Sequence, residues 1–373
     1  MDPVLKRTEQ TGHDAVARLR LRAQGLLPDP GNPPDPAAVV RRLGMMQAQD
    51  LAQAFWALGV RIPGSTAGTV RAALDRGLVV RTWGARGTLM LLAPETVRPL
   101  LSITAPRMRA QSAATHRREN ITEAELAALL PLALAACAPA GASRARLMEV
   151  FAEAGHDVAA QRGYHLLVAL CLSGELVQGP MEPGSNTRQL FVGSSTWLPR
   201  GTSVADNRAP DALPGWGLLY FQGHGPATVA DCAWWLGLPL TPVRAALATL
   251  EGQLGERVLD GQRYLFDPGS EDAWEEPPGG DSVLVLPGFD EFLLGYKDRT
   301  ATLPTEHADA VTPGGNGVFR RTLTVGGQTI GTCQPPAGRV QDGAVLPFAR
   351  HPSARLERLA LARIRAYGTF RDS

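Results

Sequence analysis

The chain lacks the features that would build a metal or disulfide centre or cross a membrane. Its four cysteines, Cys137, Cys171, Cys232 and Cys333, lie far apart, with no CxxC pair and no histidine at ligand spacing. This spacing predicts buried, reduced thiols and no metal site. The longest apolar runs are broken by proline and are too short to span a bilayer. No apolar segment follows the N-terminal cations, so we expect no signal peptide, no membrane association and a cytoplasmic, nucleoid-associated protein.

The sequence also lacks the signatures of several enzyme classes. It contains no GxSxG motif, no phosphate-binding P-loop and no GxGxxG placed after a strand. These absences argue against a hydrolase or transferase acting on small molecules. We expect no cofactor.

Composition indicates a globular chain with an uneven charge distribution. Its 373 residues, 44% hydrophobic and 20% charged, predict roughly two to four domains. The net charge is only +1, but residues 1–120 carry +8 and the remainder −7. Nearly all the cations are arginine, whose planar fork matches phosphate oxygens. The N-terminal part is therefore suited to nucleic acid, although a GC-rich genome also raises the arginine content.

Helical and strand patterns recur along the chain. After a helix over 13–26, the pattern predicts helices at 36–43, 51–58 and 66–76 and then a β-hairpin, 78–83 with 88–92. Helices followed by a hairpin are typical of a winged helix. The same order returns twice, ending in hairpins at 175–192 and 257–266, the last across the turn signal Asp260-Gly261.

The repeats predict an α+β fold of three tandem winged-helix units. The last quarter differs: its predicted strands and final helix, 352–367, fit a small β-barrel closed by a helix. The expected domains are 1–101, 102–204, 205–280 and 281–373.

Two glutamines stand before the second helix of the first unit. In an extended segment, Gln47 and Gln49 project on the same face, so their amides point at one spot. An amide offers an acceptor and a donor, and a pair of them can hold one water, but neither transfers a proton. The alternative is that both are solvated residues ahead of a helix capped by Asp50.

Several segments together resemble the winged-helix family of AlkZ-type alkylpurine DNA glycosylases. The matching segments are residues 19–26 (LRLRAQGL), 47–49 (QAQ), 81–89 (RTWGARGTL), 224–231 (HGPATVAD), 286–299 (LPGFDEFLLGYKDR) and 317–331. The resemblance implies three winged helices with a β-barrel. Gln47 and Gln49 match the family's catalytic Gln-x-Gln signature. One departure is Met90, where the family often has histidine, and a thioether cannot replace an imidazole in hydrogen bonding.

The resemblance implies a monofunctional DNA glycosylase that releases cationic alkylated purines. An N7-alkylguanine or N3-alkyladenine is positively charged, so its glycosidic bond is already weakened and needs little protonation of the leaving group. Two amides would then suffice to place a water at C1′ and stabilise an oxocarbenium-like state. No lysine nucleophile lies near the motif, so lyase activity is not expected. Bulky adducts and interstrand crosslinks are further implied substrates.

The expected partner is double-stranded DNA, bound by a monomer. The predicted contacts are Arg41, Arg81, Trp83, Arg86, Arg107 and Arg109. Trp83 either wedges against a base or packs in the core, and the basic run from Arg107 either contacts phosphate or is solvated. The main rival function is a non-enzymatic winged-helix regulator or lesion sensor. Regulators usually dimerise, and residues 356–366 are the one candidate dimerisation helix.

Overall fold

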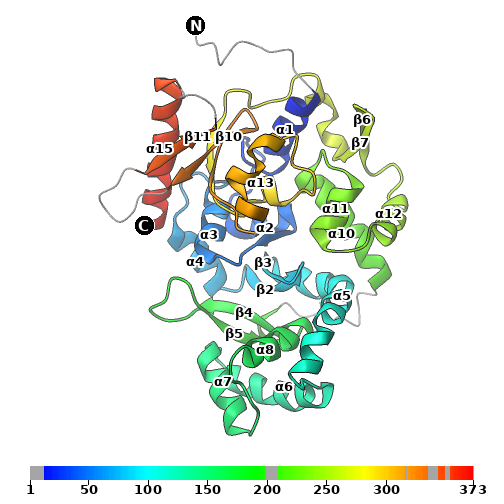
Figure 1. Ribbon diagram of the computed structural model, residues 1–373, viewed down its shortest axis with the longest axis vertical. Helices are drawn as coiled ribbons and strands as arrows, with labels where there is room; N and C mark the ends of the chain where they lie inside the picture. The colour runs from blue at the N-terminus through cyan, green and yellow to red at the C-terminus, as the bar shows by residue number, and fades with distance from the viewer. Residues whose placement is uncertain (1–11, 199–208, 316, 335–342, 349–352, 373) are drawn as a thin grey trace.

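The computed structural model describes residues 12–198, 209–315, 317–334, 343–348 and 353–372. Figure 1 shows a central sheet with helices α6, α7 and α8 below it, α10, α11 and α12 on the right, and α15 on the left. Residues 1–11, to which the signal-peptide prediction refers, and the predicted boundary at 204/205 lie outside the described residues.

The first part of the chain forms four helices and three strands. They are α1 (Gly12–Ala23), α2 (Pro36–Leu43), β1 (Met45–Gln47), α3 (Leu51–Gly59), α4 (Ala67–Asp75), β2 (Val80–Ala85) and β3 (Thr88–Leu92). Side-chain caps fix where the helices begin: Asp35 caps α2 and Thr66 caps α4. The predicted cap at Asp50 is confirmed, because its Oδ1 accepts from the Gln53 N–H at 3.1 Å and starts α3 directly after the glutamine pair.

The next two parts repeat this order. They comprise α6 (Glu123–Cys137), α7 (Arg144–Glu153), α8 (Arg162–Leu172), β4 (Leu176–Met181), β5 (Gln189–Gly193) and α9 (Ser194–Trp197), then α10 (Ala209–His224), α11 (Val229–Leu236), α12 (Leu240–Ala248), β6 (Gly255–Leu259) and β7 (Gln262–Phe266). The predicted turn at Asp260-Gly261 joins β6 to β7, with positive φ at both residues. A long helix that the sequence pattern did not indicate, α5 (Val97–Arg118), and a short turn, η2 (Pro94–Thr96), connect the first part to the second.

One pairing is common to all three parts. In the first, β1 pairs with β3, the second strand of its hairpin. In the second, Ala142 pairs with Phe191, and in the third, Ala227 pairs with Leu265. Each time, an extended segment between the first two helices returns to the last strand of the hairpin, so the sequence repeat has a structural counterpart.

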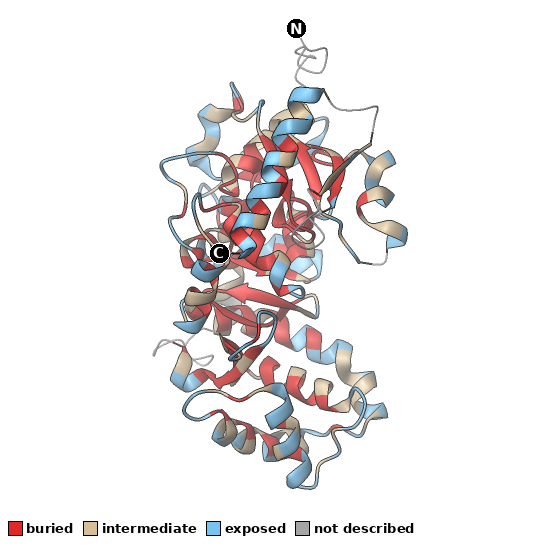
Figure 2. Cartoon of the chain, turned by 90° about the vertical axis from the view of Figure 1, so that its left-hand side faces the viewer, coloured by how far each residue is buried: buried red, intermediate tan, exposed pale blue. Residues whose placement is uncertain are grey.

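The first two hairpins form a single sheet with the strand order β1-β3-β2-β4-β5. The two hairpins meet where Arg81 of β2 pairs with Gln178 of β4. The four hairpin strands are almost wholly buried, as Figure 2 shows. Alternate side chains of β1 enter different cores, Met45 with α5 and α8, and Met46 with α2, α3 and α4. The glutamine pair therefore lies on the edge strand of a sheet that is packed on both faces.

The C-terminal part forms an open sheet. Its elements are the turn η3 (Pro268–Trp274), β8 (Val283–Leu286), α13 (Glu291–Leu294), η4 (Thr305–His307), α14 (Ala308–Val311), η5 (Pro313–Gly315), β9 (Thr322–Val325), β10 (Gln328–Gln334), β11 (Ala344–Pro347) and α15 (Ala354–Asp372). The strands run in the order β11-β10-β9-β8, and in the described residues β8 and β11 are not paired with each other. The predicted barrel is therefore wrong. Four strands enclose too little space for their side chains, and Ala360 and Ile364 of α15 cover one face of the sheet instead.

The end of α15 also packs on the first part of the chain. Trp56 of α3 meets Tyr367 and Phe370 edge-on, with ring centroids 5.3 and 5.2 Å apart. A Cβ at Gly59 would lie 2.4 Å from the Phe370 ring, so the close approach requires glycine there. The apolar face of the candidate dimerisation helix is therefore covered within the chain.

All four cysteines are buried and free, which confirms the prediction of reduced thiols. Burial raises the pKa of Cys137 to about 11.

Among the described residues, no group of three or more potential ligands could hold a metal ion. No single described helix is long and apolar enough to cross a membrane. The helices 94–118 and 123–137 meet that test only as a pair bent by 102°.

A buried ion pair joins the C-terminal part to α3. The Arg61 guanidinium donates to both Asp290 carboxylate oxygens, at 2.9 and 2.8 Å, and both side chains are almost fully enclosed. Asp290→Ala leaves an unpaired buried cation, so we expect it to lower the free energy of unfolding by about 3–5 kcal/mol in urea titrations. The control Arg146→Ala removes an exposed pair with Glu149 and should barely move the midpoint. Equal shifts in the two variants would contradict this role.

Candidate functional site

The two glutamines lie at adjacent positions along β3. Gln47 ends β1 and pairs with Met90, whereas Gln49 follows the strand and accepts from the Leu89 N–H through its side-chain oxygen, at 3.3 Å. The intervening Ala48 N–H donates to the Leu89 carbonyl at 2.8 Å. Gln47 is half-buried and Gln49 is exposed. Within the described residues, the Gln47 amide makes no hydrogen bond, so both its donor and its acceptor are available to a ligand.

Met90 is the cross-strand partner of Gln47 on one side and of Thr82 on the other. Directly opposed residues in antiparallel strands share a face, so all three side chains belong to one row across the sheet. Met90 is fully buried. The departure from the expected histidine therefore lies directly beside Gln47, where a thioether supplies packing and no strong hydrogen bond.

A buried carboxylate holds the backbone of Gln47 from outside the sheet. Because β1 is an edge strand, its outward N–H groups need partners other than a strand. Glu291, at the start of α13 and 1% exposed, accepts from the Gln47 N–H through Oε1 at 3.2 Å. Its Oε2 accepts from Trp235 Nε1 at 3.0 Å and lies 3.3 Å from His224 Nε2.

The surroundings keep Glu291 ionised. Burial by itself raises the pKa of this carboxyl, but the hydrogen bond to His224, the positive charge of Arg86 and the Gln47 N–H outweigh burial. The net pKa is below its ordinary value, so the group is a hydrogen-bond acceptor at neutral pH and not a general acid.

Arg81 fixes the other end of the motif. One guanidinium nitrogen donates to the Gln49 carbonyl at 3.3 Å, and the other donates to the side-chain oxygens of Gln178 and Gln189 at 3.0 and 3.4 Å. Arg81 is 7% exposed. Burial lowers its pKa to about 10, against an opposing contribution from Asp50. Arg81 thus connects the glutamine segment to the second hairpin.

The predicted DNA contacts divide into covered and exposed side chains. Trp83 is 4% exposed and packs edge-on against Tyr164 at 5.7 Å. Arg86, at a turn with φ of 53°, lies 4.7 Å from the Trp234 ring and donates to the Trp235 carbonyl. Together with the buried Arg81, these placements favour packing and positioning over contact with DNA.

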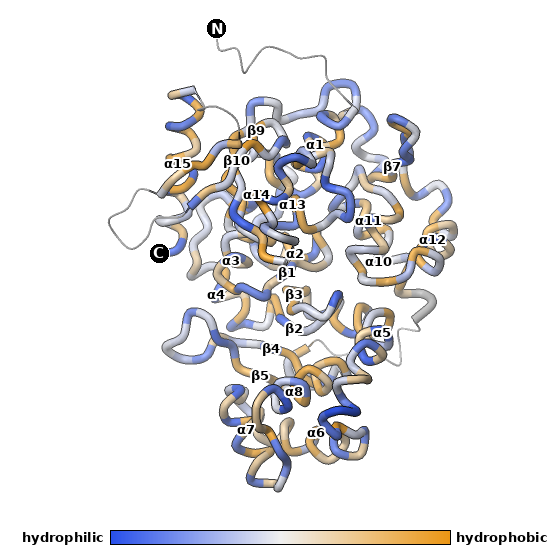
Figure 3. The backbone as a smooth tube through the Cα atoms, in the orientation of Figure 1, coloured by the Kyte–Doolittle hydropathy of each residue, from blue (hydrophilic) through white to orange (hydrophobic). Residues whose placement is uncertain are grey.

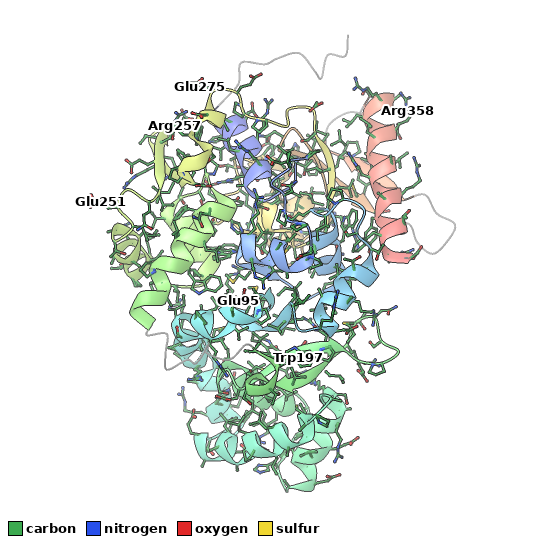
Figure 4. The ribbon with its side chains drawn as sticks, turned by 180° about the vertical axis from the view of Figure 1, so that it is seen from behind. Glu95, Trp197, Glu251, Arg257, Glu275 and Arg358 are labelled. Atoms are coloured by element: carbon green, nitrogen blue, oxygen red, sulfur yellow. The ribbon has the colours of Figure 1, made fainter. Side chains whose placement is uncertain are left out.

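The other predicted contacts are exposed. Arg107 and Arg109 lie on α5, whose last turn is basic and hydrophilic (Figure 3). Arg41 is exposed as well, but its Nε donates to Glu95 at 2.7 Å, and Figure 4 labels Glu95 near the middle of the molecule. Phosphate contact by Arg41 would therefore compete with an existing ion pair, whereas the Arg107 guanidinium has no such partner among the described residues.

Two cavities flank the turn of the first hairpin and not the glutamine pair. The larger, about 350 Å³, is lined by Arg86 and Arg107 together with Trp234 and Gly237 at the end of α11. The smaller, about 230 Å³, lies between Trp83, Gly87 and Tyr164. Met108 and Gln111 of α5 line both. The hollow surface thus begins at the hairpin turn and follows α5.

Four of the segments that carry the family resemblance, 19–26, 47–49, 224–231 and 286–299, meet in one buried polar network behind β1. Gln24, which follows α1, donates to the Glu291 carbonyl and accepts from Arg61, and Arg20 donates to the Pro226 carbonyl. Asp231 accepts from the backbone of Lys297 and Asp298. The similarity therefore includes the framework behind the glutamines as well as the glutamines themselves.

Residues 40–370 match the family described as DNA glycosylase AlkZ-like. The chain belongs to this family of enzymes. It is also 26% identical over 313 residues to an interstrand DNA cross-link repair glycosylase of Streptomyces sahachiroi, covering 78% of this chain and 80% of the relative. The fold matches that of the solved S. sahachiroi DNA glycosylase AlkZ with a TM-score of 0.81 at 22% identity, over 98% of both chains. The likeness confirms the mixed helix-and-strand fold, and membership makes DNA the substrate polymer.

Sequence reasoning missed Glu291, His224 and Trp235 as neighbours of the motif. A signal existed, because Asp290 and Glu291 are two acidic residues in an otherwise apolar segment, and such charges are almost always paired when buried. The sequence did not reveal which groups they would meet.

The two classes of arginine can be separated by salt dependence. Arg107→Ala should reduce the slope of log K against log salt by about 0.9 for each phosphate that is no longer neutralised. Arg81→Met should leave the slope unchanged, because the guanidinium it removes is enclosed in the sheet. Fluorescence anisotropy of a labelled duplex across a salt series measures both, with circular dichroism to verify folding. An equal loss of slope in the two variants would show that Arg81 reaches DNA.

Proposed function

We propose that this enzyme is a monofunctional DNA glycosylase that hydrolyses the N-glycosidic bond of cationic alkylated purines, with Gln47 and Gln49 as its catalytic pair. The observation that carries the proposal is the Gln47 side-chain amide on the edge strand of the matched fold, which has no hydrogen-bond partner in the described part of the chain. It lies two residues from a Gln49 that the sheet holds in place. N7-alkylguanine and N3-alkyladenine are the proposed lesions.

The chemistry follows from what amides can do. The C1′–N bond breaks with its electron pair going to the cationic base, which leaves neutral without protonation. A placed water then forms the C1′–O bond and loses its proton to solvent, so the reaction needs the placed water and stabilisation of positive charge on the sugar. The Gln47 oxygen accepts a hydrogen bond from the attacking water and orients it toward C1′. The side-chain oxygen of Gln49 stays on the Leu89 N–H, which leaves its NH2 group free to position the water or the sugar. Asp50 is engaged as the cap of α3.

The DNA interface that we propose runs along α5 and the first hairpin. Both Arg107 and Arg109 are exposed there; Arg107 lines the larger cavity, and Arg109 donates to the Leu172 carbonyl at 2.8 Å. We further propose that the three repeated parts are winged-helix units, with the C-terminal open sheet as the fourth domain. We also propose a monomer, because the apolar face of α15, the candidate dimerisation helix, packs on the C-terminal sheet and on α3.

Crosslinked DNA is a second proposed substrate, since the S. sahachiroi relative is named for interstrand cross-link repair. Because Met90 stands beside Gln47 where the family often has histidine, we expect it to affect the range of lesions that this enzyme accepts. A non-enzymatic regulator is the less favoured function, because such a protein would not need a Gln-x-Gln segment fixed at both ends by buried side chains.

The test is the release of 7-methylguanine from methylated duplex DNA under single-turnover conditions. Gln47→Ala and Gln49→Ala should each lower the rate by on the order of 10²–10³-fold, as expected for loss of a preorganised polar group. Their affinity for the same duplex should stay unchanged. The matched control is Gln253→Ala, which removes an exposed glutamine of the third part and should retain the wild-type rate.

If the wild type releases no 7-methylguanine, the same assay is repeated with a crosslinked duplex. Unhooking that requires Gln47 and Gln49 would move the substrate to bulky lesions and keep the catalytic pair. Inactivity on both substrates, with DNA binding intact, would overturn the glycosylase proposal in favour of a binding protein.

A further inference from the structure

Gln47 differs from the residues around it in how it is held. The Gln49 side chain accepts a hydrogen bond from the Leu89 N–H, and the Gln49 backbone carbonyl accepts one from Arg81. The Ala48 N–H donates to the Leu89 carbonyl of β3. No described residue bonds to the Gln47 side chain. The direction of this amide therefore depends on its backbone, and the outward N–H of that backbone meets a single group, the Glu291 carboxylate.

We infer that Glu291 is a positioning residue for catalysis, which orients Gln47 through its backbone N–H. This inference rests on the proposed function and adds a residue from the far end of the chain to it. The carboxylate does not touch the DNA in this role, since it is 1% exposed and its oxygens are already engaged. It acts on the reaction through Gln47 alone.

Three parts of the chain keep Glu291 in place. His224, at the end of α10, is fully buried and stacks on Tyr220 at 4.8 Å, so its ring presents Nε2 to the carboxylate in a fixed direction. Trp235 of α11 is fully buried and donates to the same oxygen. The backbone of Glu291 is bonded to Gln24. Since all these groups are enclosed, the carboxylate has little freedom to follow a displaced strand.

The rigid Glu291 carboxylate behind Gln47 affects the rate of the reaction. Placement of a water at C1′ tolerates little error, and a displacement of about 1 Å can cost on the order of 10²-fold in rate. Without the carboxylate, the edge strand loses the partner of the Gln47 N–H and gains freedom to bend away from Glu291. Binding of the duplex, which uses other surfaces, should not change.

The first experiment needs no substrate. In protein labelled with ¹⁵N-glutamine, the backbone N–H signal of Gln47 is assigned by its absence from Gln47→Ala. The hydrogen-exchange rate of this N–H is then measured. Glu291→Ala should accelerate exchange at Gln47 by at least about tenfold, because it removes the acceptor. The matched control is Asp231→Asn, a carboxylate of equal burial whose partners are the backbone amides of Thr228, Lys297 and Asp298. It should lower stability and leave Gln47 exchange unchanged.

The second experiment is a double-mutant cycle on single-turnover base release. Glu291→Ala should lower the rate by on the order of 10²-fold with an unchanged dissociation constant for DNA, and it should cause no further loss in a Gln47→Ala background. Glu291→Gln keeps an oxygen for Gln47 but presents its NH2 to the Trp235 N–H. The double variant Glu291→Gln/Trp235→Phe removes that conflict and should recover most of the rate.

The outcomes separate this inference from the proposed function. Unchanged Gln47 exchange in Glu291→Ala, or rate losses of Glu291→Ala and Gln47→Ala that multiply, would overturn the positioning role while the glycosylase stands. A base-release rate that falls in Gln47→Ala but stays at the wild-type value in Glu291→Ala would overturn the positioning role in the same way. A wild type inactive on both methylated and crosslinked DNA removes the proposed function and, with it, any catalytic meaning of the Glu291 contact.

Discussion

Two consecutive buried carboxylates hold three distant parts of this chain together. Asp290 neutralises Arg61, which also donates to Gln24 just after α1, and Glu291 accepts from the β1 backbone and from Trp235 of the third part. A buried charge is tolerated only when it is paired and its hydrogen bonds are satisfied. One short turn at the start of α13 therefore constrains the relative positions of β1, α11 and the segments that follow α1 and α3.

The chemistry of the site follows from what this framework leaves open. Carboxylates near the glutamines are committed, Asp50 to a helix cap and Glu291 to the backbone. What remains accessible is a pair of neutral amides at the rim of the sheet. Such a site can orient water and stabilise a cation but cannot supply a proton, so it suits a leaving group that is already charged. The shared five-stranded sheet adds stiffness, since Arg81 bonds the motif to the second hairpin as well.

Some expectations about the fold failed for identifiable reasons. The strand and helix pattern of the C-terminal part did not reveal that only four strands form its sheet, too few to close a barrel, or that α15 covers the apolar face. The long helix α5 escaped notice because Pro99 and Pro106 interrupt its pattern, although proline is tolerated in the first turn of a helix and the helix continues past Pro106. Of the two alternatives for Trp83, a wedge against a base or packing in the core, the structure favours packing, because Tyr164 of α8 lies against its ring.

The sequence by itself determined what depends on neighbouring residues. Asp50 capping α3, the Asp260-Gly261 turn, the repeated order of helices and hairpins and the buried thiols follow from local dihedral preferences, hydrogen bonds over a few residues or composition. The signature at Gln47 and Gln49 came from the resemblance to a known family. Tertiary structure alone decided that Glu291, 244 residues away, meets the Gln47 N–H, that Arg81 and Trp83 are enclosed, and that the C-terminal sheet stays open. Such contacts depend on how separate layers pack, and no local preference encodes which distant group will satisfy an exposed N–H on an edge strand.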